Sequence, residues 1–503
     1  MSSKVVSVYA VASGKSYSFV DNGEPMKGAV KDVYFSPDRK YVVAIFREVL
    51  DDNQKERLTR ITQQYLKQIE SREAANFYLN DIFRWPIDVI KYGDLTGVIV
   101  PTYDKKFFFN KGYENSDLIN GKEKNGKWFA GPKFRHQYFP LKVAKAELGD
   151  WLSYFQICLN LVRGVKKMHA MGLAHSDLSY NNVLIDPISK SACIIDLDGL
   201  VVPGLFPAEV IGTAEFIAPE VLATKHLDKK DPDRKLPNRL TDLHALSVLI
   251  YMFLLHRHPL KGGKVHDFDV EKDDLLSMGE RALFIEHPQN MENRPKVEHL
   301  SKWELPWADV TKLPYTLTGP YLTELFNQSF ITGLHHPNSR PTASIWEQAI
   351  AKTVDLMQPC QNKDCDQRWY VFDNTAKPQC PFCGSNHIGP LPMIDLYYQS
   401  EPGKWKMENH RIMIYHNQSL FQWHVNKNVI RNENLTDEQK KPVGYFSFFN
   451  DKWLFVNTSL NTLKDLTEGK TISPGEMIVL TEDKKILLSA ENGGRLALIK
   501  LIS

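Results

Sequence analysis

The order of periodic patterns along the chain predicts an α+β protein, in which a mixed body is followed by a small metal module and a β-rich terminal domain. Strand-like segments surround one long helical segment in residues 1–103, and helical periodicity dominates residues 150–357. Four cysteines then fall between residues 360 and 383, and short strands follow. At 503 residues, the chain has room for about three such parts.

Residues 1–103 are expected to form strands around one charged helix. The first strand-like segments are VVSVYAVA, KDVYF and YVVAIF, and the turn-forming SPDRK joins the last two. Residues 51–83 contain neither Gly nor Pro and are rich in helix formers, so a continuous helix is predicted there. Two further strands, DVIKY and GVIVP, follow the turn at Pro86.

Residues 104–356 are expected to be mostly helical after an irregular start. Residues 104–147 are rich in Lys, Gly and aromatic residues, and they fit either a cover over a binding site or a long surface loop. An apolar stripe at helical spacing follows, made of Trp151, Phe155, Cys158, Val162 and Val165. A helix over 243–255 is apolar nearly all round and should be buried, and a last helix covers 343–357.

Composition argues against several classes of protein. There are 62 basic and 60 acidic residues, and a net charge of +2 gives no sign of a nucleic-acid partner. The longest nearly apolar run, Ala245–Leu255, is shorter than the ~20 residues that span a bilayer, so no membrane partner is expected. The short apolar stretch near the start fits a β-strand better than its alternative, a secretory signal. Six cysteines do not make a secreted disulfide scaffold.

The stretch HSDLSYNNVLIDPISKSACIIDLDGL, residues 175–200, carries the residues best suited to catalysis. Asp177 and Asn182 precede a segment of hairpin length, and Asp196 follows it, so a hairpin would bring the three side chains to one edge. Phosphoryl transfer needs such a set, with a base to orient a hydroxyl and an acid and an amide to hold Mg²⁺. The stretch resembles the protein-kinase catalytic loop H-x-D-L-x-x-x-N followed by D-F-G.

Three further segments strengthen the resemblance to protein kinases. Ala218, Pro219 and Glu220 form the A-P-E triplet, Asp242 stands at the head of the buried helix, and Arg340 stands where kinases keep the arginine that pairs with the triplet's glutamate. The resemblance implies a bilobal kinase fold, ATP and Mg²⁺ as cofactors, and protein substrates. It also implies that Asp177 orients the acceptor hydroxyl while Asn182 and Asp196 bind Mg²⁺.

Departures from the kinase pattern leave an alternative open. Ser176 replaces an arginine that awaits an activation-loop phosphate, which suggests that no such phosphate is needed. Ser179 replaces a lysine that touches the transferred phosphate, and Asp198 replaces the glycine of D-F-G. The alternative is a pseudokinase scaffold that binds nucleotide or partners without phosphoryl transfer.

The usual phosphate-binding lysine is absent from its strand. If Ala44 is the alanine that covers adenine, the lysine position holds Phe46, and the next residue, Arg47, points to the opposite face. One strand earlier, Gly28 and Lys31 stand in a G-x-x-K-x-V-Y frame that resembles the with-no-lysine kinases, which move the lysine into the glycine-loop strand.

Gly28, Lys31 and Ala44 are therefore expected to bind the nucleotide together with Asn182 and Asp196. A competing register uses Gly23, Gly28 and Val30, and leaves Lys31 solvated. The acidic partner of Lys31 should lie on the helix before Pro86, where Glu73 is preferred over Glu70.

The cysteines have the spacing of a zinc site. Cys360 and Cys365 form Cys-x4-Cys, and Cys380 and Cys383 form Cys-x2-Cys within the knuckle CPFCG. Four thiolates make a closed, structural Zn²⁺ site, and a segment this short cannot bury a core without metal. The alternative is two disulfides. Cys158 and Cys193 lie in apolar stretches and are expected to be core residues.

The longer motifs resemble one bacterial group of kinases, that of the tellurite-resistance-associated (TerY-P) phosphorylation triad. They include IIDLDGLVVPGLFPAEVIGT and GLHHPNSRPTASIWEQA, followed by the cysteine ribbon. The resemblance implies a cytoplasmic serine/threonine kinase that acts in stress signalling with a PP2C-type phosphatase and a von Willebrand factor A protein. The expected domains are a kinase N-lobe (1–103), a C-lobe (104–356), a zinc ribbon (357–390) and a β-rich domain (391–503).

The last domain is expected to be a β-sandwich. KWLFVNTSL and EGKTISPGEMIVL resemble the second half of forkhead-associated (FHA) sandwiches, which bind phosphothreonine. The first half lacks the G-R and S-x-x-H residues of those domains, so a degenerate sandwich for protein contacts is favoured over phosphate binding.

Overall fold

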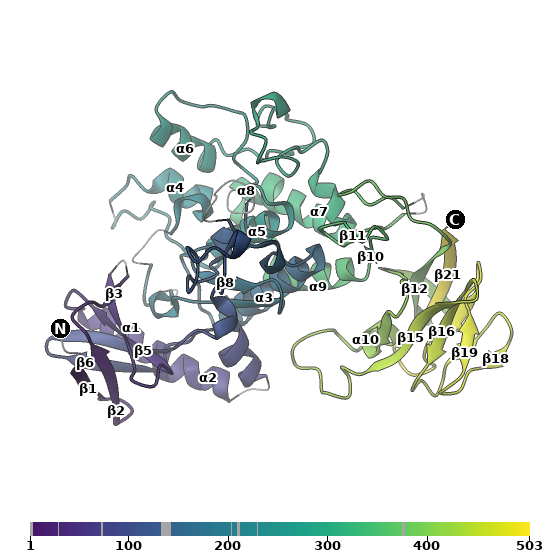
Figure 1. The fold of residues 1–503 in the computed structure, drawn as a ribbon, viewed down its shortest axis with the longest axis horizontal. Coiled ribbons are helices and arrows are strands. Elements are labelled where there is room, and N and C mark those ends of the chain that lie inside the picture. The colour runs from purple at the N-terminus through teal and green to yellow at the C-terminus, as the bar shows by residue number, and fades with distance from the viewer. Residues whose placement is uncertain are drawn as a thin grey trace. The chain divides into compact units, whose positions relative to one another are not determined.

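The structure is a computed structural model that describes residues 4–28, 30–71, 74–131, 142–202, 204–208, 212–228, 230–374 and 378–502 (Figure 1). The chain divides into two compact units. The first consists of residues 1–149, 153–314 and 325–347, and the second of residues 150–152, 315–324 and 348–503.

The first unit begins with a seven-stranded antiparallel sheet in the order β2-β1-β6-β7-β5-β4-β3. Its strands are β1 (Lys4–Ala10), β2 (Lys15–Asp21), β3 (Met26–Lys27), β4 (Lys31–Phe35), β5 (Tyr41–Phe46), β6 (Asp88–Tyr92) and β7 (Leu95–Pro101). Strand side chains alternate between faces, so Val43 and Ile45 join one apolar cluster while Ala44 joins another with Val98. The strands expected from the sequence are all present.

The predicted continuous helix over 51–83 is wrong. The helical segments are α1 (Asp52–Thr59), the π-helical η1 (Arg60–Tyr65), α2 (Leu66–Glu70) and the π-helical η2 (Phe77–Ile82). Between α2 and η2, Ala74 has a left-handed backbone with φ +62°. Tertiary packing overrides helix propensity here, because the break lets Tyr78 and Ile82 be buried against the helical part of the unit.

The rest of the first unit is helical around one hairpin. Its helices are α3 (Trp151–Ala170), α4 (Pro219–Thr224), α5 (Arg239–Leu255), α6 (Val270–Met278), α7 (Pro320–Asn327), α8 (Gly333–His335) and α9 (Ala343–Val354), of which α3, α7 and α9 also extend into the second unit. The predicted stripe on α3 is buried, and α5 is buried from Thr241 to Leu255, as its apolar pattern predicts. The last helix ends at Val354, three residues before the predicted end.

Residues 104–147 form short 3₁₀ turns where the structure describes them, at Lys105–Phe107, Tyr113–Asn115, Gly126–Trp128 and Lys145–Glu147. Their aromatic side chains Phe107, Phe109 and Phe129 are buried. The described part of this segment therefore contributes to the core and is more than a surface loop.

The second unit contains the cysteine segment and two antiparallel sheets. The segment has strands β10 (Met357–Pro359) and β11 (Trp369–Val371). The larger sheet has the order β13-β12-β21-β20-β17-β18, with β12 (Leu391–Glu401), β13 (Lys404–Met413), β17 (Lys464–Asp465), β18 (Lys470–Thr471), β20 (Lys485–Leu487) and β21 (Arg495–Ile502). The smaller is β14-β15-β16-β19, with β14 (Ser419–Phe421), β15 (Pro442–Phe449), β16 (Lys452–Asn457) and β19 (Met477–Val479), and α10 (Gln422–Val425) follows β14.

Two apolar clusters organise the second unit. The first joins both sheets, with Leu396 and Ile499 from the larger and Phe446 and Phe455 from the smaller. The other joins the cysteine segment to the larger sheet through Cys365, Tyr370, Cys380, Met393, Met413 and Ile502. The cysteine segment thus shares a core with the strands that follow it.

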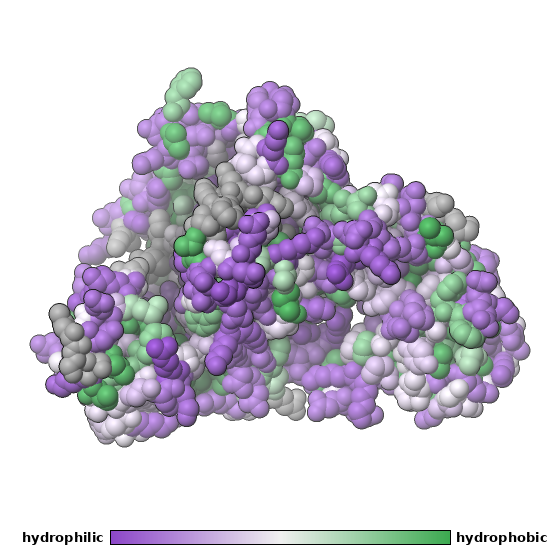
Figure 2. All heavy atoms as spheres, in the orientation of Figure 1, coloured by the Kyte–Doolittle hydropathy of each residue, from purple (hydrophilic) through white to green (hydrophobic). Residues whose placement is uncertain are grey.

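Within the described residues, no helix is both long and apolar enough to cross a membrane. The face drawn in Figure 2 is largely hydrophilic, with hydrophobic residues scattered in small groups. Isolated exposed apolar residues of this kind are normal on a folded protein.

Candidate functional site

The predicted hairpin is confirmed, as β8 (Val183–Asp186) pairs antiparallel with β9 (Ser191–Ile194). At its open end the backbone N–H of Ile195 donates to the carbonyl of Asn182 at 3.0 Å. The buried carboxylate of Asp242 holds the loop before the hairpin. It accepts hydrogen bonds from the backbone N–H groups of His175 at 2.8 Å and Ser176 at 3.1 Å. These bonds hold Ser176 in a left-handed backbone with φ +68°.

Asp177 lies at the centre of a hydrogen-bond network. The Asn182 amide donates to Asp177 Oδ2 at 2.9 Å and to its carbonyl at 2.8 Å. The backbone N–H and the hydroxyl of Thr213 both donate to Asp177 Oδ1, at 2.6 and 2.8 Å. The Thr213 hydroxyl also lies 3.1 Å from the hydroxyl of the buried Ser179. The structure therefore brings Asp177 and Asn182 together within the loop that precedes the hairpin.

Thr213 was not among the residues singled out from the sequence. The signal for it is its place five residues before Ala218 in GTAEFIAPE, the stretch that contains the A-P-E triplet. Its hydroxyl donates to Asp177 and lies within hydrogen-bond distance of the hydroxyl of Ser179, the residue that stands in place of the lysine of the kinase pattern.

Asp196 directly follows the hairpin in a left-handed backbone, with φ +60° and ψ +47°. Lys31 Nζ donates to Asp196 Oδ1 at 3.1 Å, and to the two carboxylate oxygens of Asp198 at 2.9 and 2.6 Å. The side chain of Asp196 is 53% exposed, whereas that of Asp198 is 8% exposed. The structure thus joins β4 to the segment after β9 through one lysine and two carboxylates.

These three groups change each other's protonation. Burial disfavours the Lys31 ammonium, yet Asp198 and Asp196 together raise the pKa of Lys31. Partial burial also opposes ionisation of Asp196, but Lys31 and His175 hold the pKa of its carboxyl below the usual value. Burial raises the pKa of the Asp198 carboxyl even though Lys31 opposes that shift. Asp198 therefore depends on Lys31 for its charge more than Asp196 does.

The strand register explains how Lys31 reaches this position. Lys31 pairs with Phe46 and Val33 pairs with Ala44, so Lys31, Ala44 and Phe46 share one face of the sheet. Lys31 Nζ lies 5.3 Å from the centre of the Phe46 ring. The Lys31 side chain is only 17% exposed, whereas the competing register expects a solvated lysine.

Arg47 faces the other way, as expected. Its Nε lies 3.3 Å from the carboxylate of Asp32, the neighbour of Lys31 on the opposite face, and its guanidinium also donates to the carbonyl of Gly28. Gly28 closes the turn between β3 and β4 by donating its N–H to the carbonyl of Lys31 at 2.9 Å. A Cβ there would lie 3.2 Å from that carbonyl, which favours glycine.

The predicted acidic partner of Lys31 on the helix is not located. Glu73 lies outside the described residues, and Glu70 is exposed at the end of α2. Within the described residues, the carboxylates that contact Lys31 are those of Asp196 and Asp198.

The pairing predicted for the A-P-E glutamate is confirmed. Arg340 binds Glu220 with two parallel hydrogen bonds of 2.8 Å, and it also donates to the carbonyl of Leu240 at 2.9 Å. The Arg340 side chain is 1% exposed. This ion pair ties the start of α4 to the segment that precedes α9.

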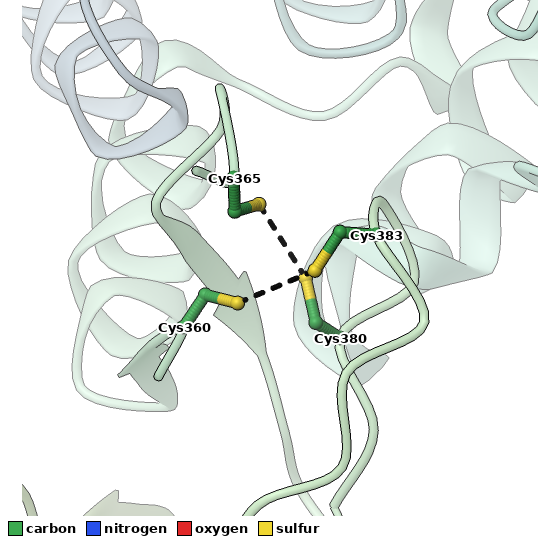
Figure 3. A group of neighbouring side chains, drawn as sticks. All are labelled: Cys360, Cys365, Cys380 and Cys383. Atoms are coloured by element: carbon green, nitrogen blue, oxygen red, sulfur yellow. Dashed lines mark hydrogen bonds between the residues drawn. The ribbon is translucent and has the colours of Figure 1, made fainter. Parts of the chain in front are cut away.

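The four cysteines of the second unit come together at one point (Figure 3). Their sulfur atoms all lie within 4.8 Å of one another, with Cys360 and Cys383 at 3.5 Å and Cys365 and Cys380 at 3.8 Å. Zn–S bonds of about 2.3 Å in a tetrahedron imply S···S distances of about 3.8 Å, so the cluster fits Zn²⁺. All six cysteines of the chain are free thiols, which argues against the two-disulfide alternative.

Comparisons with known proteins point to protein kinases. The protein kinase domain family matches residues 148–376. The chain is 33% identical over 102 residues to a dual serine/threonine and tyrosine protein kinase of Apis mellifera, which covers 20% of the chain and 9% of that protein. It is 27% identical over 145 residues to the serine/threonine-protein kinase SRK2D of Arabidopsis thaliana, which covers 28% of the chain and 36% of that protein. The chain thus spans well under two thirds of either relative.

A solved structure, the kinase domain of a Toxoplasma gondii specific rhoptry antigen, is similar over 70% of this chain and 86% of its own. The TM-score is 0.39 and the sequence identity is 12%. The family match includes Asp177, Asn182, Asp196 and Arg340, whereas Lys31 lies before it. Residues 148–376 therefore match the protein kinase domain family, and the two relatives named are protein kinases.

Proposed function

We propose that this chain is an ATP-dependent protein kinase that transfers the γ-phosphoryl group to serine or threonine of protein substrates. The observation that supports this most is the convergence of Lys31 on Asp196, beside a loop in which Asp177 and Asn182 are hydrogen-bonded to each other. Phosphoryl transfer depends almost entirely on positioning and charge, and these residues supply both.

Each residue has a role in the proposed reaction. Asp177 accepts the proton of the acceptor hydroxyl and orients its oxygen, while Lys31 holds phosphate oxygens by charge-assisted hydrogen bonds. Asn182 and Asp196 offer the amide and carboxylate oxygens that suit Mg²⁺, and Mg²⁺ when bound offsets the charge of the phosphates. Gly28 lets the backbone of the β3–β4 turn approach the nucleotide, and Ala44 lies on the same face of the sheet as Lys31.

The contacts of Thr213 support an ordered acceptor site beside Asp177. Its hydroxyl and backbone N–H bind Asp177, and its hydroxyl also meets Ser179, so the segment before the A-P-E triplet is ordered against the base. An acceptor side chain that reaches Asp177 then lies beside Thr213 and Ser179, which are already ordered by their hydrogen bonds. Of the relatives named above, SRK2D is a serine/threonine-protein kinase, whereas the Apis mellifera protein is a dual serine/threonine and tyrosine protein kinase.

The remaining parts of the proposal concern the other domains and the setting. The cysteine segment (357–390) is a zinc ribbon with a closed, structural site, and residues 391–503 form a β-sandwich for protein contacts, since two antiparallel sheets share one core. The resemblance to the tellurite-resistance-associated triad supports a further proposal, that the kinase acts in the cytoplasm of a bacterium with a PP2C-type phosphatase and a von Willebrand factor A protein as partners.

The direct test is phosphoryl transfer from γ-labelled ATP, by autophosphorylation and to a mixture of protein substrates. Asp177→Asn and Asp196→Ala should each abolish transfer, because one loses the proton acceptor and the other a metal ligand, while both keep the wild-type unfolding temperature. Asp233→Asn, at an exposed carboxylate of the same unit, is the matched control and should be fully active. Nucleotide binding without transfer by the wild type would instead indicate the pseudokinase scaffold.

A further inference from the structure

Asp198 stands where the kinase motif carries glycine, and the sequence gives no use for a carboxylate there. In the structure it lies in the 3₁₀ turn η8 (Leu197–Gly199), with its side chain 8% exposed. Both of its oxygens accept hydrogen bonds from Lys31 Nζ, at 2.9 and 2.6 Å, which is closer than the 3.1 Å contact with Asp196. The strongest contact of the displaced lysine is thus made to a residue outside the expected catalytic set.

We propose that Asp198 is the positioning residue for Lys31, and that it fills the role expected of a glutamate on the helix before Pro86. This inference rests on the proposed kinase function. Lys31 and Asp198 are both largely buried, and a buried carboxylate is stable as an anion only with a close cation. Within the described residues, Asp198 and Asp196 supply all the carboxylate contacts of Lys31, while Glu70 is exposed.

The ion pair of Lys31 with Asp198 has two consequences for a phosphate-binding lysine that lies on β4: it limits the motion of the ammonium, and it affects the contact of Lys31 with Asp196. A lysine side chain has four flexible carbons, so an ammonium without a fixed partner samples many positions and binds phosphate at an entropic cost. Asp198 holds the ammonium in place before nucleotide arrives. It also shares the Lys31 ammonium with Asp196, which is the proposed metal ligand. Without Asp198, Asp196 would be the one carboxylate among the described residues that contacts Lys31. Without Asp198, Lys31 would compete with Mg²⁺ for Asp196.

The first test is a double-mutant cycle in the full chain, measured by single-turnover transfer. Asp198→Asn should lower the rate about tenfold or more, because a charge-assisted bond typically contributes a factor of this size. Asp198→Asn added to Lys31→Met should cause no further loss, because Asp198 acts through Lys31. Asp198→Glu should recover part of the rate. Losses that multiply in the double variant, or an Asp198→Asn protein as fast as the wild type, would overturn the proposal.

The second test does not depend on activity. The rate at which an acylating reagent labels Lys31, followed by mass spectrometry, reports how firmly the Lys31 ammonium is held by its partners. Because Asp198 makes the shortest contacts of the Lys31 ammonium and holds it in place, Asp198→Asn should label Lys31 faster, while the exposed Lys40 should label equally in both proteins. Unchanged Lys31 labelling would overturn the role of Asp198. A wild type that transfers no phosphate would overturn the proposed function alone, since the labelling result stands without it.

Discussion

At the scale of single residues, Phe46 contributes to the position of Lys31 in the candidate nucleotide site. It occupies the strand position of the missing lysine, and its ring lies 5.3 Å from Lys31 Nζ. An aromatic ring attracts a cation through its face. Phe46, which stands in the usual lysine position, therefore also helps to position Lys31. Arg47, the nearest cation in sequence, is turned away to Asp32 by strand alternation.

This arrangement predicts opposite outcomes for two neighbouring cations. Lys31→Met should reduce phosphoryl transfer about tenfold to a hundredfold, because it removes a charge-assisted contact worth ~1.5–3 kcal/mol at 1.4 kcal/mol per decade. Arg47→Met is the matched control and should change transfer much less, because its guanidinium lies on the other face of the sheet. The measurement is the single-turnover rate of both variants. An inactive Arg47→Met with an active Lys31→Met would contradict the assignment.

The sequence singles out Lys31 as a candidate but gives no sign of its contact with Asp198. The G-x-x-K-x-V-Y frame and the strand period together specify the face and reach of Lys31, both of which are local properties. In the sequence, Asp198 is only a departure from the D-F-G pattern. Its role becomes visible only through its contact with Lys31, which lies 167 residues earlier in the chain. Long-range ion pairs of this kind have no local signal in a single sequence.

At the scale of elements, the break between α2 and η2 shows the same limit. Residues 51–83 have good helix propensity throughout, and nothing in the sequence marks Ala74 for a left-handed backbone. The break is set by the packing of the later segment, since Ile82 lies against α3 near Gly164. Strands were predicted well because alternation is local, whereas this turn depends on a partner helix.

Gly164 is the glycine of α3 that lies against this later segment. A Cβ at this position would lie 2.7 Å from Ile194 Cδ1 on β9 and 2.8 Å from Ile82 Cγ2 on η2. Gly164→Val should therefore lower the free energy of unfolding by about 1–3 kcal/mol, the usual cost of overpacking a core. Chemical denaturation measures this, and Gln156→Val places the same side chain at a half-buried position of the same helix, away from the close approach. Equal effects of the two variants would show that the close approach does not matter.

At the scale of the whole molecule, the cysteine segment is not the separate module that its length suggests. The predicted boundary at residue 390 divides one apolar cluster, because Tyr370 and Cys380 pack with Met393 and Ile502. The four-cysteine spacing was visible in the sequence, but this shared core was not, since it joins residues more than 100 positions apart. A metal bound by the cysteines would therefore stabilise the strands β12 and β21 as well as its own loops.

The consequence can be measured by removing the metal ligand. The purified, reduced protein should carry about one zinc per chain by elemental analysis. Cys380→Ser should lower the unfolding temperature of the second unit and increase hydrogen exchange in residues 357–390, 391–401 and 495–502, because the cluster loses both metal and packing. Binding of Mg²⁺-ADP should be unchanged, since the proposed nucleotide site lies in the first unit.

Cys158→Ser supplies the matched control for this experiment. Cys158 is fully buried on α3 in the first unit and lies outside the metal cluster, so the same chemical change should destabilise the first unit and leave zinc content intact. If Cys380→Ser loosened residues 357–390 while β12 and β21 kept their protection, the ribbon would fold independently of the sheet. Exchange that spreads into both strands would instead mean that the metal sets the stability of the sheet beside it, because Cys380, Met393 and Ile502 belong to one apolar cluster.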